Sequence, residues 1–144
     1  MADEKTIAMS EELAENEFAR WAEENDINTD TASMNDDEKN SFDGMKKKVV
    51  KSISLGQTVV NDEGNLEITL GKNNPEGYKG SVLTFKAPSA QAYLGIDNFK
   101  ANQNVHRMVA VMSAMTGKDI SYFSKICNKD FKLFMVIATF FLAD

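Results

Sequence analysis

Asn65-Leu-Glu-Ile-Thr-Leu70 is the stretch of sequence that decides the fold class. Leu66, Ile68 and Leu70 alternate with polar residues, which is typical of a strand with one buried face. The preceding segment, Asn61 to Asn65, is built from residues that favour turns. A β-branched series before that turn, from Val49 to Val60, has strand character. We therefore expect a hairpin of two strands, at about residues 48–60 and 65–71.

Beyond the hairpin, the apolar period changes from two to about 3.6 residues. A third strand is expected at about 81–86, because Leu83 and Phe85 share one face and Pro88 stops the run. The later pattern predicts helices at about 89–97, 103–116, 119–127 and 129–143. The predicted fold class is α+β, with a small antiparallel β-meander of about three strands followed by a cluster of three to four helices.

The N-terminal part of the chain has a different composition. Residues 1–43 hold 14 of the 22 acidic residues and three basic ones, a net charge of −11 in a chain of net charge −6. Ser10 is a suitable N-cap for a short amphipathic helix near 11–24, and residues 25–43 have the polar composition of a linker. We therefore predict an acidic, largely disordered arm at 1–43 and an α+β domain at 44–144.

Few residues offer chemistry. His106 is the single histidine and has no neighbouring cysteine or carboxylate pattern for a metal or a triad, and Cys127 has no second catalytic group. The glycines never form a phosphate-binding loop that runs into a helix. The basic residues Lys46 to Lys48 lack interleaved aromatic residues, so a solvated strand end is favoured over a nucleic-acid site. We expect no enzyme activity, no cofactor, no metal and no nucleic acid.

The sequence also bears on location. A single cysteine excludes an internal disulfide and fits a reducing cytoplasm, and the acidic N-terminus does not resemble an export signal. The most apolar stretch, Phe131 to Ala143, is shorter than the roughly 20 residues that span a bilayer. A cytoplasmic protein without membrane insertion is expected.

Three apolar features point to protein partners. The first is a methionine stripe that is either a core face or an adaptable binding surface. The second is the last helix, which is apolar nearly all round and could face a core, a sister subunit or a client. The third is the aromatic pair of the helix near 11–24, which is either a binding motif or the docked face of that helix. The candidate partner-binding residues are Met108, Met112, Met115, Phe131, Phe134, Met135, Phe141, Phe18 and Trp21.

The second half of the chain resembles a known family. The order is a strand ending in Leu-Thr-Phe-Lys-Ala-Pro88, a helix closing in Met-Thr-Gly117, the segment Ile120 to Ile126, and Asp130-Phe131 opening an apolar helix. This order is similar to the small tail assembly chaperones of Mu-like and related tailed phages. The resemblance covers about residues 50–144, and the acidic segment before residue 44 departs from the family pattern.

The resemblance implies a non-enzymatic role in the host cytoplasm. Members of the family bind the long helical tape measure protein, keep it soluble and help tail tube subunits assemble around it. The expected partners are therefore the tape measure protein and the tail tube protein, and self-association is a further option. The protein is not expected in the mature virion. The rival hypotheses are an acidic DNA mimic or inhibitor, supported by the arm alone, and a permanent structural component of the tail.

Overall fold

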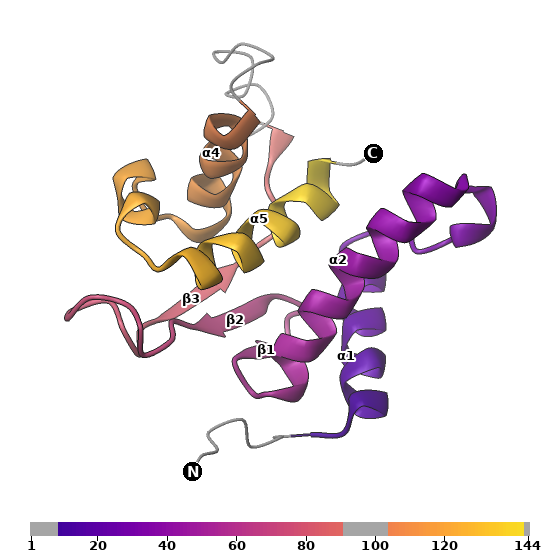
Figure 1. The fold of residues 1–144 in the computed structure, drawn as a ribbon, viewed down its shortest axis with the longest axis horizontal. Coiled ribbons are helices and arrows are strands. Elements are labelled where there is room, and N and C mark those ends of the chain that lie inside the picture. Colours follow the sequence, from indigo (N-terminus) through magenta and orange to yellow (C-terminus); the bar gives the residue numbers. More distant parts are fainter. Residues whose placement is uncertain (1–8, 91–103, 143–144) are drawn as a thin grey trace. The chain divides into compact units, whose positions relative to one another are not determined.

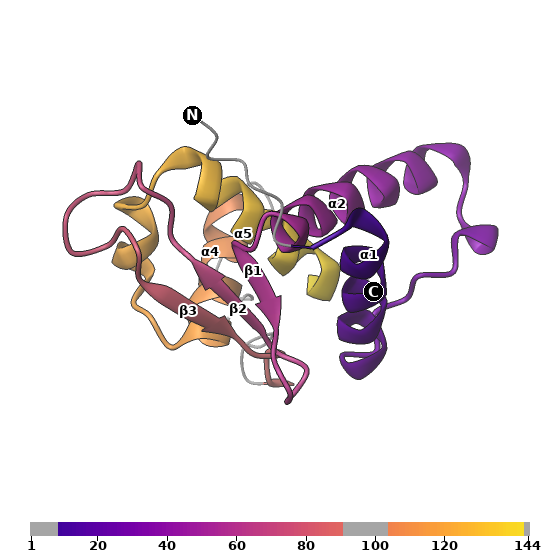
Figure 2. The ribbon, with the colours of Figure 1, turned by 90° about the horizontal axis from the view of Figure 1, so that it is seen from below.

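The computed structural model describes residues 9–90 and 104–142 (Figures 1 and 2). The helices are α1 (Glu11–Glu24), α2 (Asp36–Ser54), α4 (Asn104–Thr116) and α5 (Asn128–Leu142), with short 3-10 helices η1 (Thr31–Ser33) and η2 (Ile120–Ser124). The strands are β1 (Thr58–Val60), β2 (Leu66–Thr69) and β3 (Val82–Phe85), in an antiparallel sheet of order β1-β2-β3. The predicted α+β class is confirmed.

The chain forms two compact units, residues 1–66 and 67–144. This division differs from the predicted one at residue 43, because α2 continues across that position. The helix predicted at 89–97 lies almost entirely outside the described residues. The helices predicted at 103–116 and 129–143 correspond to α4 and α5, whereas the one at 119–127 is the shorter η2.

Helix α1 forms as its sequence predicts. The Ser10 side chain accepts a hydrogen bond from the backbone N–H of Leu13 at 3.2 Å, which caps the first turn. Glu11 and Glu12 follow at the positive end of the helix dipole. The apolar face of α1 is buried: Ala14, Phe18, Trp21 and Ala22 are each at most 1% exposed.

Helix α2 corrects two predictions, the linker at 25–43 and the strand at 48–60. It begins at a capping box in which Asn35 and Glu38 satisfy each other's backbone N–H groups, at 2.8 and 3.0 Å. Its buried residues Phe42, Val49 and Ile53 recur at helical spacing, and α2 packs against α1 and β1. Burial of this face outweighs the strand propensity of the valines and isoleucine, so only Thr58–Val60 remains extended.

The predicted turn between the first two strands is confirmed. The Asn61 side chain accepts hydrogen bonds from the backbone N–H groups of Glu63 at 2.9 Å and Asn65 at 3.0 Å. Within the same unit, Arg20 of α1 donates to the carbonyls of Val60 at 2.8 Å and Asn61 at 3.1 Å. A hydrogen bond with Glu17 raises the pKa of the Arg20 guanidinium above its usual value. These contacts fix α1 to the end of β1 and the start of the turn that follows it.

The second unit packs α4 and α5 on one face of β3 (Figure 2). Leu83 and Phe85 of β3 point to the same buried side, as their alternation predicts. Phe85 meets Phe134 of α5 with ring centroids 4.8 Å apart. The apolar surface of α5 is enclosed at Leu133, Phe134, Ile137, Ala138 and Phe140, while Val136, Phe141 and Leu142 are half-buried.

Candidate functional site

Most of the predicted partner-binding residues are part of the two cores. Phe18 and Trp21 are each 1% exposed in the first unit, so the docked-helix interpretation holds and they are not accessible motif anchors. Met112, Met115 and Phe134 are buried in the second unit, which makes that part of the stripe a core face. Met108, Phe131, Met135 and Phe141 are half-buried.

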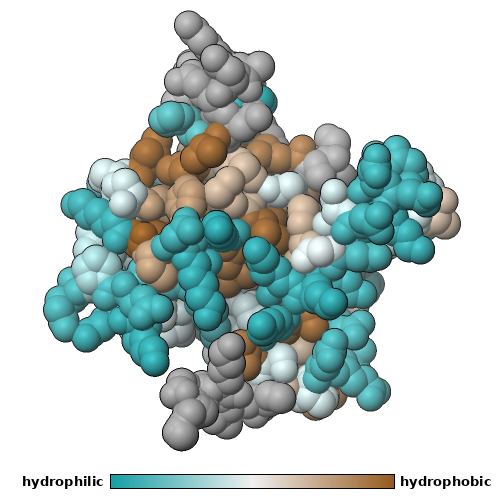
Figure 3. All heavy atoms as spheres, viewed as in Figure 1, coloured by the Kyte–Doolittle hydropathy of each residue, from teal (hydrophilic) through white to brown (hydrophobic). Residues whose placement is uncertain are grey.

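Of the nine predicted residues, Phe131 alone lines the apolar groove of the second unit. This groove has a volume of about 460 Å³ and lies between α4, η2 and the start of α5. Figure 3 shows apolar side chains gathered over α4 and α5, bordered by hydrophilic ones. The lining residues are Val105, His106, Val109, Ile120, Ser121, Phe123, Ser124, Ile126, Asn128 and Phe131. We refer to this feature as the α4–α5 groove.

The floor and the edge of the groove differ in burial. Phe123 is 2% exposed and meets Phe134 edge-on, with ring centroids 6.3 Å apart. Val105 and Ile120 are 50% and 49% exposed, so large apolar surfaces remain in contact with water. An exposed apolar rim above a rigid aromatic floor is typical of a surface that binds a protein partner.

The turn between α4 and η2 fixes one wall of the groove. Gly117 has φ of +77°, the left-handed conformation that closes a helix at little cost to glycine. The Thr116 side chain donates to the carbonyl of Met112 at 2.8 Å and accepts from the N–H of Lys118 at 3.2 Å. These bonds direct the chain into η2, where Ile120 stands at the groove edge.

The other wall is fixed by a buried polar network at the start of α5. Asp130 is 2% exposed, and its Oδ2 accepts hydrogen bonds from the Gly71 N–H at 2.9 Å and Asn74 Nδ2 at 2.8 Å. Asn74 Oδ1 in turn accepts from the Cys127 N–H at 2.7 Å. The network joins the 71–74 loop to the junction of η2 and α5, so it positions Asn128 and Phe131.

The two candidate chemical residues, His106 and Cys127, both lie in the second unit. His106 is exposed on α4 at the groove, and Cys127 is half-buried beside the Asn74 network. Within residues 9–90 and 104–142, no group of three or more His, Cys, Asp or Glu side chains is placed to hold a metal ion. No helix in these ranges is long and apolar enough to cross a membrane.

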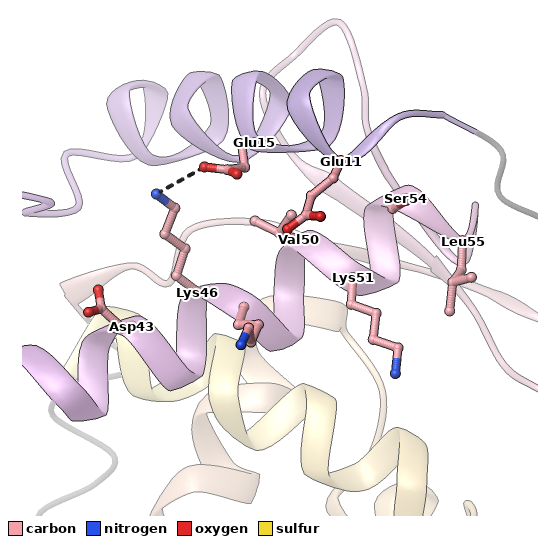
Figure 4. Close-up of a pocket in the computed structure, with 9 residues that line it drawn as sticks. Glu11, Glu15, Asp43, Lys46, Val50, Lys51, Ser54 and Leu55 are labelled. Atoms are coloured by element: carbon pink, nitrogen blue, oxygen red, sulfur yellow. Dashed lines mark ion pairs between the residues drawn. The ribbon is translucent and has the colours of Figure 1, made fainter.

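A second hollow, of about 530 Å³, lies in the first unit between α1 and α2 (Figure 4). Its lining mixes acidic and basic side chains around Val50. Lys46 Nζ is 3.6 Å from Glu15 Oε1 and 5.9 Å from the Phe18 ring centroid, which joins the two helices. The basic cluster that begins at Lys46 is therefore on α2, and one member has a structural role. Most residues that line this hollow are charged, whereas no Asp, Glu, Lys or Arg lines the α4–α5 groove.

Sequence patterns did not identify Val105, Val109, Ile120, Phe123 and Ile126 as site residues. All five are apolar residues of predicted helices, but periodicity does not distinguish a residue that faces the core from one at an open rim.

Comparison of the chain with protein-family models, curated proteins and solved structures finds no match in any of the three.

Proposed function

We propose that this protein is a non-enzymatic assembly chaperone that binds an apolar helical segment of the tape measure protein during phage tail assembly. The observation that carries the proposal is the α4–α5 groove, with Val105 and Ile120 half-exposed at its rim. A monomer leaves such a surface open to water at a cost, and a helical client would bury it.

The second unit also supplies the features on which the family resemblance rests. Strand β3 precedes Pro88, α4 ends at Thr116 before Gly117, and Asp130 lies in the first turn of α5, followed by Phe131. In this protein, two of these features have a definite physical role at the groove: Gly117 turns the chain toward Ile120, and Asp130 fixes the start of α5. The resemblance and the geometry therefore support the same surface.

Host cytoplasm is the proposed location, since the client would be bound there before tails are complete. A tail tube subunit is a second proposed partner, through the resemblance alone. In this proposal the client-bound form is transient, because tail tube subunits would displace the protein as they cover the tape measure protein.

An acidic DNA mimic is the second candidate, and α1 favours it in one respect. The carboxylates of α1 stand on a packed helix and not on a flexible arm, as a mimic of ordered phosphates requires. However, Glu17 pairs with Arg20 at 2.9 Å and Glu15 with Lys46 at 3.6 Å, so cations interrupt the acidic array. For this reason we favour the chaperone function over the DNA-mimic function.

Co-expression with the proposed client, a tape measure protein, would test the proposal. We expect the partner to be soluble and to co-purify with the chain, and to be insoluble without it. Mass spectrometry of purified particles separates the chaperone from a permanent tail component, because the chaperone should be absent. An insoluble and unbound partner would contradict the proposed function.

A further inference from the structure

We propose that the α4–α5 groove selects amphipathic helices whose apolar stripe is flanked by acidic residues. The inference rests on the proposed function, which it deepens by defining the chemistry of the client segment. Its basis is a lysine row, which we define as Lys125, Lys129 and Lys132, beside the apolar groove.

Each member of the lysine row is next in sequence to a groove residue. Lys125 lies between Ser124 and Ile126, Lys129 follows Asn128, and Lys132 follows Phe131. All three side chains are exposed, and among the described residues none of them forms an ion pair. The cations are therefore available to a ligand that occupies the groove.

The position of Lys129, the central member of the lysine row, is unfavourable for the isolated helix. The N-terminus of α5 is the positive end of the helix dipole, where acidic side chains stabilise and basic ones do not. Asp130 follows this rule, but it is buried and already accepts two hydrogen bonds. Lys129 lies in the same first turn and opposes the dipole. A carboxylate from a ligand would relieve this opposition by interacting with both the lysines and the helix end.

The charges on the opposite side of the groove do not cancel the attraction of the lysine row for acidic residues. Asp119 adjoins Ile120 at the far rim and is the nearest exposed carboxylate in sequence, while Arg107 and His106 lie on α4. Residues 67–144 carry nine basic and six acidic residues, whereas the whole chain has net charge −6. The groove is therefore on the basic part of an acidic protein, which favours an acidic partner at this surface.

The elements that line the groove favour a helix over an extended peptide. All ten lining residues belong to α4, η2, α5 or the short connection before α5, and no strand contributes an edge for backbone pairing. Recognition must then depend on side chains that fill apolar pockets. An amphipathic helix presents such side chains at i, i+3, i+4 and i+7.

A pair of designed peptides tests the inference. Both are 18-residue helices with the same leucine stripe, flanked by glutamate in one and by lysine in the other, and binding is followed by fluorescence anisotropy. We expect the full chain to bind the glutamate-flanked peptide at least about tenfold more tightly, the size expected from a few rim charge pairs. The difference should shrink as salt is raised.

Variants of the full chain separate this inference from the proposed function. The triple variant Lys125→Glu, Lys129→Glu, Lys132→Glu should reverse the preference between the peptides. The matched variant Lys72→Glu, Lys79→Glu, Lys86→Glu, with the same change of net charge on exposed residues of the same unit, should retain it. Circular dichroism would confirm that both variants are folded.

Equal binding of the two peptides, or an equal effect of the two triple variants, would overturn the inference that the groove selects acidic helices. The proposed function would not be contradicted, because the groove could still bind its client. Failure of both peptides to bind would overturn the inference and count against the proposed function as well. The oligomeric state of the wild type and of Val105→Asp supplies a further check. If the wild type is a dimer in solution and Val105→Asp is a monomer, the groove binds a second copy of the chain, and the inference is overturned.

Discussion

Asn74 Nδ2 donates a hydrogen bond of 2.8 Å to Asp130 Oδ2, a contact between residues 56 positions apart that fixes the start of α5. Asn74 is 5% exposed and Asp130 is 2% exposed, so this bond is shielded from bulk solvent. The Asn74 amide also donates to the Gly71 carbonyl at 2.8 Å and accepts from the Cys127 N–H at 2.7 Å. A single amide thus joins the 71–74 loop to the wall of the groove.

Replacement of Asp130 should destabilise this region. Asp130→Ala removes the acceptor of the buried Asn74 side-chain amide and of the part-buried Gly71 N–H, and we expect a cost of about 1–3 kcal/mol. Hydrogen–deuterium exchange should show faster exchange in peptides from 71–80 and from the start of α5. The exposed Asp119→Ala is the control, with an expected change within about 0.5 kcal/mol. Unchanged exchange in Asp130→Ala would show that the network is not stabilising.

Gly44 provides a test of α2. It lies inside the helix with nothing within 4 Å of an added Cβ, so Gly44→Ala should stabilise the first unit by about 0.5–1 kcal/mol. Urea unfolding followed by fluorescence of the buried Trp21 measures the effect. If residues 25–43 and their continuation were an unstructured linker, this substitution would leave the midpoint unchanged.

Gly64→Ala is the matched substitution in the same unit and should have the opposite sign. Gly64 has φ of +80°, and an added Cβ would lie 2.9 Å from the Glu24 Cβ. Both the backbone conformation and the contact disfavour alanine, so we expect a loss of roughly 1 kcal/mol or more. A neutral or stabilising effect in the same fluorescence experiment would contradict the close approach of α1 to the hairpin turn.

The methionine stripe should behave as core at its centre. Met112 is 0% exposed, and Met112→Ala should cost about 2–5 kcal/mol, whereas Met108→Ala, at a half-buried position, should cost less. Thermal unfolding by circular dichroism measures both. A Met112→Ala variant with unchanged stability and impaired client binding would restore the interpretation of Met112 as a binding residue.

Tyr122 should make stability sensitive to alkaline pH. Burial, with a smaller effect from Tyr78 at a ring-centroid distance of 5.0 Å, raises the pKa of Tyr122 above its usual value of 10. Because the folded state holds the proton more tightly, this contribution to stability is complete below about pH 10 and is lost as the pH rises through the folded pKa. Tyr122→Phe should therefore lose less stability than wild type over that rise in urea unfolding. An identical alkaline loss in the two proteins would exclude this role.

Strands β2 and β3 were predictable because their signal is local. Leu66 and Ile68 alternate with polar residues over a few positions, and Asn61 bonds to its own turn. Helix α2 was missed although its start was present in the sequence, as Asn35 and Glu38 form a capping box. The β-branched Val49 and Ile53 suggested a strand, and only their burial, on a helix that packs against α1, decides in favour of a helix.

The groove was not predictable in the same way. Ile120 and Phe123 lie three positions apart on one short element, yet Ile120 is 49% exposed and Phe123 is 2% exposed. That difference depends on where α4 and α5 lie around η2, which is tertiary information. The sequence identified the helices that carry the site, but it could not distinguish the rim from the core.

The most direct measurement of the central claim is the affinity of the purified chain for the tape measure protein, wild type against the variant Val105→Asp with Ile120→Asp. Both positions are about half exposed, so the variant should remain folded. We expect a loss of at least about tenfold in affinity, from two rim contacts of roughly 1 kcal/mol each. Val82→Asp, at an exposed valine outside the groove lining, should bind as wild type does. Equal affinity of the groove variant and wild type would contradict the proposal that the α4–α5 groove holds the client.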